Sequence, residues 1–142
     1  MESSNQKLDL LVMGAHPDDA ELGAGATIAK EVSLGKRVGI LDFTRGELGT
    51  RGNAETRDRE SFLAAKLLGV CVRENMNFKD GFFVNDQEHQ LALIQKIRKF
   101  KPEVVICNAV HDRHIDHAKG SKLASDACFL SGLSKIETQD EQ

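Results

Sequence analysis

The sequence of 142 residues lacks a basic excess, a long apolar run and an N-terminal targeting pattern. Its 19 Lys and Arg residues face 22 Asp and Glu residues, which gives a formal net charge of -3. Proteins that bind nucleic-acid phosphates usually carry a basic excess, so we expect no nucleic-acid partner. No apolar run is long enough to span a bilayer, and residues 1–7 lack the basic and apolar blocks of a signal peptide. We therefore predict a cytoplasmic protein with no membrane partner.

Cysteines are also few, and their arrangement excludes two kinds of site. Cys71, Cys107 and Cys128 are odd in number and lie far apart among apolar residues. Disulfide frameworks and Cys-x-x-Cys zinc sites need other spacings. We predict three buried free thiols that pack as small apolar side chains.

Short apolar runs alternate with helical patterns along the chain, without an internal repeat. The apolar runs predict strands at residues 8–13, 37–44, 70–78 and 104–107. Helices are predicted at residues 20–34, from Asn53 or Thr56 to Leu68, from a capping box at Asn85 to Pro102, and at residues 116–130. Residues 1–7 and 134–142 are polar and expected to be flexible. This alternation in one domain indicates an α/β fold, a Rossmann-like parallel sheet with helices on both faces.

Two polar segments follow predicted strands, residues 14–21 after the first and residues 111–117 after the fourth. Ligands of open α/β sheets gather at the carboxyl ends of the strands, so we expect both segments at one rim. Imidazole and carboxylate suit Zn²⁺, and catalytic zinc usually takes three protein ligands and a water. Adjacent residues of an extended segment point to opposite sides, so Asp18 and Asp19 can do different work.

These motifs have two other interpretations, of which the first remains open. The segment His16-Pro17-Asp18-Asp19 can be a turn with helix-capping aspartates. Gly23-Ala24-Gly25 resembles part of a dinucleotide fingerprint, but its third glycine is missing and its position after the strand is wrong, so we reject NAD binding as the main interpretation.

At these residues the chain resembles the LmbE-like (PIG-L) zinc-dependent N-acetylglucosamine de-N-acetylases. The matching elements are residues 15–19 with Glu21, and residues 114–117. Residues 44–52 look like the bacillithiol-biosynthesis deacetylases of that family. The resemblance covers nearly the whole chain, residues 1–142, as a single deacetylase domain. Family members are usually longer, so we expect a shortened chain that lacks the family's C-terminal portion.

The resemblance implies a role for six residues. His16, Asp19 and His117 match the zinc ligands, a site that Fe²⁺ can also fill. Asp18 matches the general base, His114 the residue that stabilises the oxyanion or protonates the departing amine, and Asp116 the residue that orients His114.

The implied reaction is removal of acetate from an N-acetylglucosaminide, in the bacillithiol branch N-acetylglucosaminyl-L-malate. Malate is anionic, so Arg45 or Arg51 can bind its carboxylate, with Arg57 and Arg113 as competitors and structural ion pairs as the alternative for each. The resemblance also implies a homo-oligomer, hexamers included. Two other functions stay open: a non-catalytic metal- or sugar-binding domain, and a zinc hydrolase of another N-acyl substrate.

Overall fold

The computed structural model describes residues 6–139, in which four strands and four helices alternate. The elements are β1 (Leu10–Gly14), α1 (Asp19–Ser33), β2 (Val38–Thr44), α2 (Ala54–Leu68), β3 (Val72–Phe78), α3 (Gln87–Phe100), β4 (Val104–Ile106) and α4 (Ile115–Ser131). All eight predicted elements are present. None of the helices in the described part of the chain is long and apolar enough to cross a membrane.

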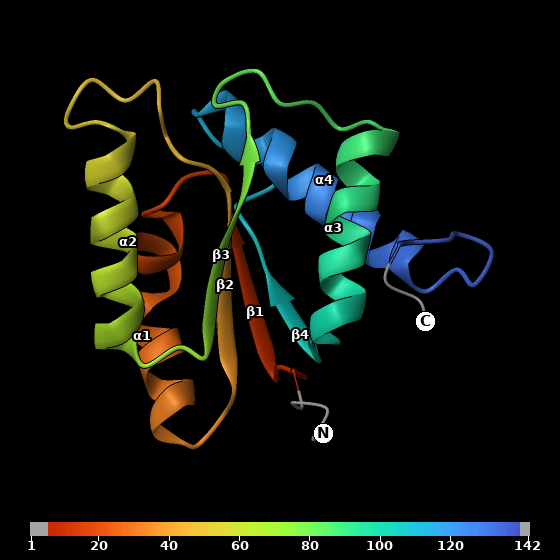
Figure 1. Ribbon diagram of the computed structural model, residues 1–142, viewed down its shortest axis with the longest axis horizontal. Coiled ribbons are helices and arrows are strands. Elements are labelled where there is room, and N and C mark those ends of the chain that lie inside the picture. The colour runs from red at the N-terminus through yellow and green to blue at the C-terminus, as the bar shows by residue number, and fades with distance from the viewer. Residues whose placement is uncertain (1–5, 140–142) are drawn as a thin grey trace.

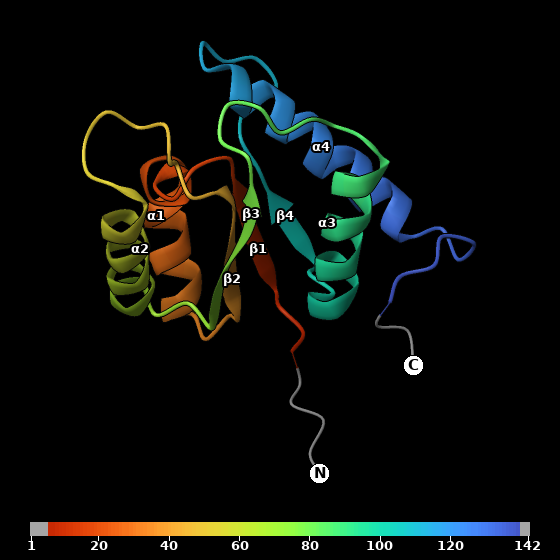
Figure 2. The same ribbon diagram turned by 45° about the horizontal axis from the view of Figure 1, so that its top comes forward.

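The strands form one parallel sheet in the order β3-β2-β1-β4. Helices α1 and α2 cover one face, and α3 and α4 cover the other (Figures 1 and 2). The two central strands are buried along their whole length, as expected for strands that are covered on both faces. The predicted Rossmann-like α/β fold is therefore confirmed.

Alternate residues of the central strands feed two separate apolar cores. Leu10 and Val12 of β1 pack with Ile28 of α1, whereas Leu11 and Met13 face α3 and α4. This alternation follows from the two-residue period of a strand. Both cores fix the direction in which β1 ends, and the loop after β1 carries the first polar segment.

Helices α2 and α3 begin at side-chain caps, one of which differs from the prediction. Asn53 caps α2 by accepting a hydrogen bond from the Thr56 amide at 2.8 Å. Helix α3 is capped by Asp86, which accepts from the His89 amide at 3.0 Å, so the capping box predicted at Asn85 is wrong.

Two predictions of burial are wrong. Strand β4 is expected to be buried, but among residues 6–139 it pairs only with β1 at the edge of the sheet, and Val104 is 55% exposed. Cys71 is exposed because it lies before the other edge strand, whereas Cys107 and Cys128 are partly buried. All three are free thiols, as predicted.

The C-terminal segment is docked on the fold as far as residue 139. Ile136 packs against the core on the α3 and α4 face, and its carbonyl accepts a hydrogen bond from Arg98 Nη1 at 2.7 Å. This contact differs from the flexible tail predicted from residue 134 onward. Residues 1–5 and 140–142, which complete the two predicted flexible ends, lie outside the described residues.

Candidate metal centre

The two polar segments meet at the carboxyl ends of neighbouring strands, at the upper rim of the sheet in Figure 1. Strand β1 is followed by the turn that begins α1, and β4 leads to the loop that begins α4. The chain moves from β1 to β2 on one side, while β4 adds to the other side of β1. This reversal is the place where open α/β sheets bind ligands.

The turn after β1 is held on both sides. Thr44 Oγ1 donates to the Ala15 carbonyl at 2.8 Å, and the Ala15 amide donates to Asn108 Oδ1 at 2.9 Å. Gly14 has no side chain where a Cβ would lie 2.9 Å from the Asp19 Cβ, so the turn can fold back on itself. The imidazole of His16, with only 10% of its side chain exposed, is thereby fixed at the floor of the site.

Three histidine rings gather around this turn. His16 and His114 meet edge to face with ring centroids 4.6 Å apart, and His117 stacks on His114 at 4.8 Å. One ring nitrogen of each of the three lies within 4.8 Å of the others. His111, the remaining histidine of the second segment, is exposed and lies outside this group.

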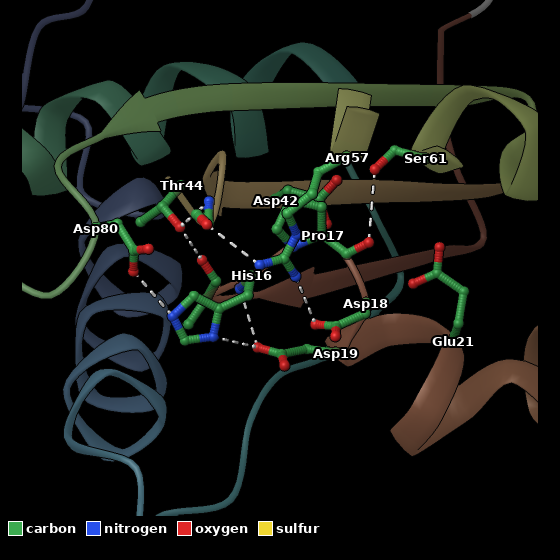
Figure 3. Close-up of polar contacts among 12 residues, drawn as sticks. His16, Pro17, Asp18, Asp19, Glu21, Asp42, Thr44, Arg57, Ser61 and Asp80 are labelled. Atoms are coloured by element: carbon green, nitrogen blue, oxygen red, sulfur yellow. Dashed lines mark hydrogen bonds and ion pairs between the residues drawn. The ribbon is translucent and has the colours of Figure 1, made fainter. Parts of the chain in front are cut away.

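Asp19 lies between His16 and His117, and Figure 3 shows its contact with His16. Its Oδ2 accepts hydrogen bonds from the His16 amide at 3.0 Å and from Asn108 Nδ2 at 3.1 Å, and lies 3.6 Å from His16 Nδ1. Its Oδ1 lies 3.3 Å from His117 Nε2. Burial opposes the ionised carboxylate, but hydrogen bonds from His16 and Asn108 outweigh it and lower the pKa of Asp19 to about 2.

In His16 and in His117, the ring nitrogen that points away from Asp19 faces another carboxylate. His16 Nε2 lies 3.1 Å from Asp80 Oδ1 and 3.0 Å from Asp116 Oδ2, and His117 Nδ1 lies 2.8 Å from Asp112 Oδ2. A neutral imidazole has one N–H, and these carboxylates take it. When both rings are neutral, the lone pairs of His16 Nδ1 and His117 Nε2 therefore face the Asp19 carboxylate.

Three electron-rich atoms that face one another need a proton or a cation between them. With a proton, burial disfavours the charged His16 ring, but Asp19, Asp116 and Asp80 together raise its pKa to about 9. With a metal ion, His16 Nδ1, Asp19 and His117 Nε2 supply a donor set that suits zinc, and each imidazole has the outer carboxylate typical of metal-binding histidines.

The group His16, Asp80 and Asp116 also has metal-ligand atoms close together, but its carboxylates are already engaged. Asp80 Oδ2 accepts from the Leu48 amide, and Asp116 Oδ2 accepts from the Gly81 amide, both at 2.9 Å. Lys119 Nζ lies 3.1 Å from Asp116 Oδ1 and disfavours a second cation there. The Nδ1 side of His16 is the better metal site.

Asp18 differs from Asp19 in exposure and in partners. It occupies the N-cap position of α1 but makes no side-chain cap, so the capping alternative does not hold for it. Its side chain is 54% exposed and lies 3.3 Å from Arg57 Nη2. Asp18 and Arg57 both line a cavity of about 390 Å³. The cavity is also lined by His16, Asp19, Leu22, Leu48, Gly49, Asp80, His114 and His117.

Asp116 contacts a different histidine from the one expected. It was predicted to orient His114, but its fully buried carboxylate accepts from His16 Nε2. Only its backbone amide reaches His114, donating to Nδ1 at 3.2 Å. His114 is the N-cap of α4, and its side chain accepts the hydrogen bond from the Asp116 amide. The Asp116 side chain lies in the first turn of the helix and points inward, toward His16.

The two arginines proposed to bind substrate lie away from the cavity. Arg45 pairs with Asp58 on the surface of α2, and Arg51 is exposed on the loop before α2. Neither lines the cavity, whereas Arg57 does. Arg57 lies on α2, and its Nη1 donates a hydrogen bond to the Gly46 carbonyl at 3.2 Å. This bond helps to hold the Arg57 side chain at the cavity.

Sequence reasoning missed two carboxylates at the site, Asp80 and Asp112. Asp80 follows β3, so the rule that placed His16 at a strand end also applies to it. Asp112 lies inside the second segment, between His111 and Arg113. In both cases the sequence contained the signal, but the histidine partner depends on loop geometry.

Sequence comparisons match this chain to one protein-family model and to several deacetylases. The model of the PIG-L family, described as GlcNAc-PI de-N-acetylase, matches residues 11–128. An uncharacterized deacetylase of Escherichia coli is 31% identical over 90% of this chain and 72% of its own length. A diacetylchitobiose deacetylase of Thermococcus kodakarensis is 28% identical over 98% of this chain and 56% of its own.

Solved structures share the fold closely. A conserved protein of Thermus thermophilus superposes with a TM-score of 0.89 at 44% identity, over 94% of this chain and 61% of that one. The N,N'-diacetylchitobiose deacetylase of Pyrococcus horikoshii gives a TM-score of 0.84 at 27% identity, over 94% and 54%. The chain thus spans little more than half the length of several relatives.

Proposed function

Since the chain belongs to the PIG-L family of GlcNAc-PI de-N-acetylases, we propose that it is a metal-dependent hydrolase that removes the acetyl group from an N-acetylated sugar. The observation that carries the proposal is the convergence of His16 Nδ1, Asp19 and His117 Nε2, each ring backed by a carboxylate. These three residues would hold the metal, Zn²⁺ or Fe²⁺.

A bound Zn²⁺ lowers the pKa of a coordinated water to about 7 and polarises an acyl carbonyl. Asp18 accepts the proton from the attacking water, because its carboxylate faces the cavity beside the metal-binding residues. A positioned base of this kind contributes roughly 10²- to 10⁴-fold to the rate.

His114 serves the other side of the reaction. The Asp116 amide donates to His114 Nδ1, so in the neutral ring Nε2 carries the hydrogen. That N–H can donate a hydrogen bond to the developing oxyanion, and the departing amine takes the proton that Asp18 accepted from the water as the C–N bond breaks. The backbone of α4, rather than the Asp116 carboxylate, sets the tautomer of His114 in this proposal.

The finer proposal is an anionic glucosaminide such as N-acetylglucosaminyl-L-malate, the bacillithiol precursor. Arg57 supports it, since its side chain lines the cavity and lies 3.3 Å from Asp18. A guanidinium binds a carboxylate bidentately. We propose Arg57 for this contact in place of Arg45 and Arg51.

Acetate release tests the proposal directly. N-acetylglucosaminyl-L-malate and diacetylchitobiose are each incubated with the protein, with and without a chelator. We expect chelator-sensitive release, and a preference for the malate compound that Arg57→Ala removes. Tight sugar binding without any hydrolysis would instead support the non-catalytic alternative. Equal hydrolysis of simple N-acyl amines would support the zinc hydrolase of another substrate.

Two variants test the division of labour between the site residues. Asp18→Ala should bind Zn²⁺ with unchanged stoichiometry and lose turnover by about 10²-fold or more. His117→Ala should lose the metal itself. If Asp18→Ala also fails to bind Zn²⁺, Asp18 belongs to the metal site and the assignment of the base is wrong.

A further inference from the structure

Glu21 belongs to the motif after β1 but has no place in the cavity. Its carboxylate, 24% exposed, points from the first turn of α1 toward β3 rather than toward the histidines. There it pairs with Arg73 of β3, whose side chain is only 7% exposed. Figure 3 shows Glu21 set apart from His16 and Asp19.

Two carboxylates fix the Arg73 guanidinium. Asp42 of β2 accepts from Arg73 Nε at 2.8 Å and from Nη2 at 3.1 Å. Glu21 accepts from Nη1, and more weakly from Nη2 at 3.4 Å. Because it is held along two edges, the planar guanidinium cannot rotate. A lysine ammonium in the same place could rotate freely.

The same guanidinium also donates to two backbone carbonyls. Arg73 Nη2 donates to the Pro17 carbonyl at 3.1 Å, and Nη1 donates to the Ser61 carbonyl at 3.3 Å. Pro17 is buried, its carbonyl precedes α1, and the only other donor to it among the described residues is Ser61 Oγ, at the longer distance of 3.5 Å. That carbonyl belongs to the same peptide group as the Asp18 amide. The orientation of this peptide plane therefore determines the position of the Asp18 Cα and the direction of its side chain.

We propose that Arg73 is a positioning residue for Asp18. By holding the Pro17 carbonyl, it fixes the peptide plane from which Asp18 enters the cavity and Asp19 turns toward His16. Glu21 and Asp42 act through Arg73 by keeping its donors in place. The inference rests on the proposed function, in which Asp18 is the base.

A merely structural ion pair is the competing explanation, and the neighbouring residue offers a matched control. Glu74 follows Arg73 on β3, is 25% exposed, and pairs with Lys96 and Lys99 of α3 on the other face of the sheet. Glu74→Gln therefore removes a comparable ion pair on the same strand without touching the loop at Pro17.

The experiment compares Arg73→Lys and Glu21→Gln with Glu74→Gln and the unchanged chain. Each protein is measured for Zn²⁺ stoichiometry, for amide hydrogen exchange at Asp18 and Asp19, and for kcat and KM of acetate release. Glu21→Gln keeps a hydrogen-bond acceptor and leaves Arg73 in place, so it still tests the proposal if Arg73→Lys does not fold.

We expect Arg73→Lys to bind Zn²⁺ but to lose kcat by at least about tenfold with KM nearly unchanged, because small misplacements of a reacting group cost up to about 10² in rate. Its Asp18 and Asp19 amides should exchange faster. Glu21→Gln should show the same changes to a smaller degree, and Glu74→Gln neither.

Unchanged kcat and exchange in both Arg73→Lys and Glu21→Gln would overturn the proposal. So would losses that Glu74→Gln reproduces. If the unchanged chain releases no acetate, the proposed function fails separately, and amide exchange at Asp18 and Asp19 still decides whether Arg73 holds this peptide.

Discussion

Gly46 offers a sharp test of how the loop before α2 controls the cavity. Its φ of +64° lies in the left-handed region, and an added Cβ would lie 2.2 Å from Arg57 Nη1 and 2.6 Å from Cζ. Because the Arg57 side chain is 21% exposed, it can move away toward solvent. Gly46→Ala is therefore expected to push Arg57 off Asp18 without disturbing the apolar cores.

The stability cost can be worked out separately from this displacement. A residue with a Cβ in the left-handed region costs roughly 1–2 kcal/mol. For a domain of this size that lowers the melting temperature by about 2–8 °C. Gly52→Ala is the matched control, since Gly52 has a φ of +73° in the same loop but its nearest neighbours, two Thr56 carbons, lie 3.8 Å away.

Thermal unfolding and steady-state kinetics on N-acetylglucosaminyl-L-malate separate the two effects. Both variants should lose a similar amount of stability and retain Zn²⁺ binding. Only Gly46→Ala should raise KM, by about tenfold or more, since a hydrogen bond to a charged group contributes about 1.5–3 kcal/mol. An equal KM in the two variants would refute the role of Arg57 and the geometric reasoning behind it.

Three further predictions concern the metal site. Asp116→Asn should weaken Zn²⁺ binding by about 10- to 100-fold in calorimetric titration, because the buried carboxylate supports His16 Nε2; unchanged affinity would contradict this support. In the metal-free chain, the folded-state pKa of His16 lies near 9, above its usual 6.5, so its stabilisation is complete below pH 6.5 and is lost as the pH rises through 9. Urea unfolding should show a loss of up to about 3 kcal/mol across that range, and His16→Gln should show none of it. Finally, Zn²⁺ at about 100 times its dissociation constant should stabilise the chain by about 2.7 kcal/mol, a gain that His117→Ala should abolish in a melting experiment.

Much of the fold was predictable because local patterns and topology agree. Aliphatic runs as short as β1, with helical patterns between them, are typical of a parallel sheet covered on both faces. Strand order at the edges was not predictable in this way. Val104 lies in an apolar run, yet β4 has only β1 beside it and leaves Val104 exposed.

For the site, the sequence by itself determined which residues could meet. His16 and Asp19 follow β1, His117 lies beyond β4, and parallel neighbouring strands bring such ends to one rim. The roles read from the family resemblance, the specific malate substrate and the homo-oligomer stay predictions.

Only the tertiary structure decided which atoms face each other. Sequence spacing does not tell whether the Asp116 carboxylate contacts His114 or His16, and in the structure it contacts His16 Nε2. Nor does it tell that Arg57, rather than Arg45, reaches the cavity, or that Arg73 holds the Pro17 carbonyl. The physical reason is that a hydrogen bond depends on the donor–acceptor distance to within a few tenths of an ångström and on the direction of the donor. These are set by loops packing across the sheet, between residues as much as 100 positions apart.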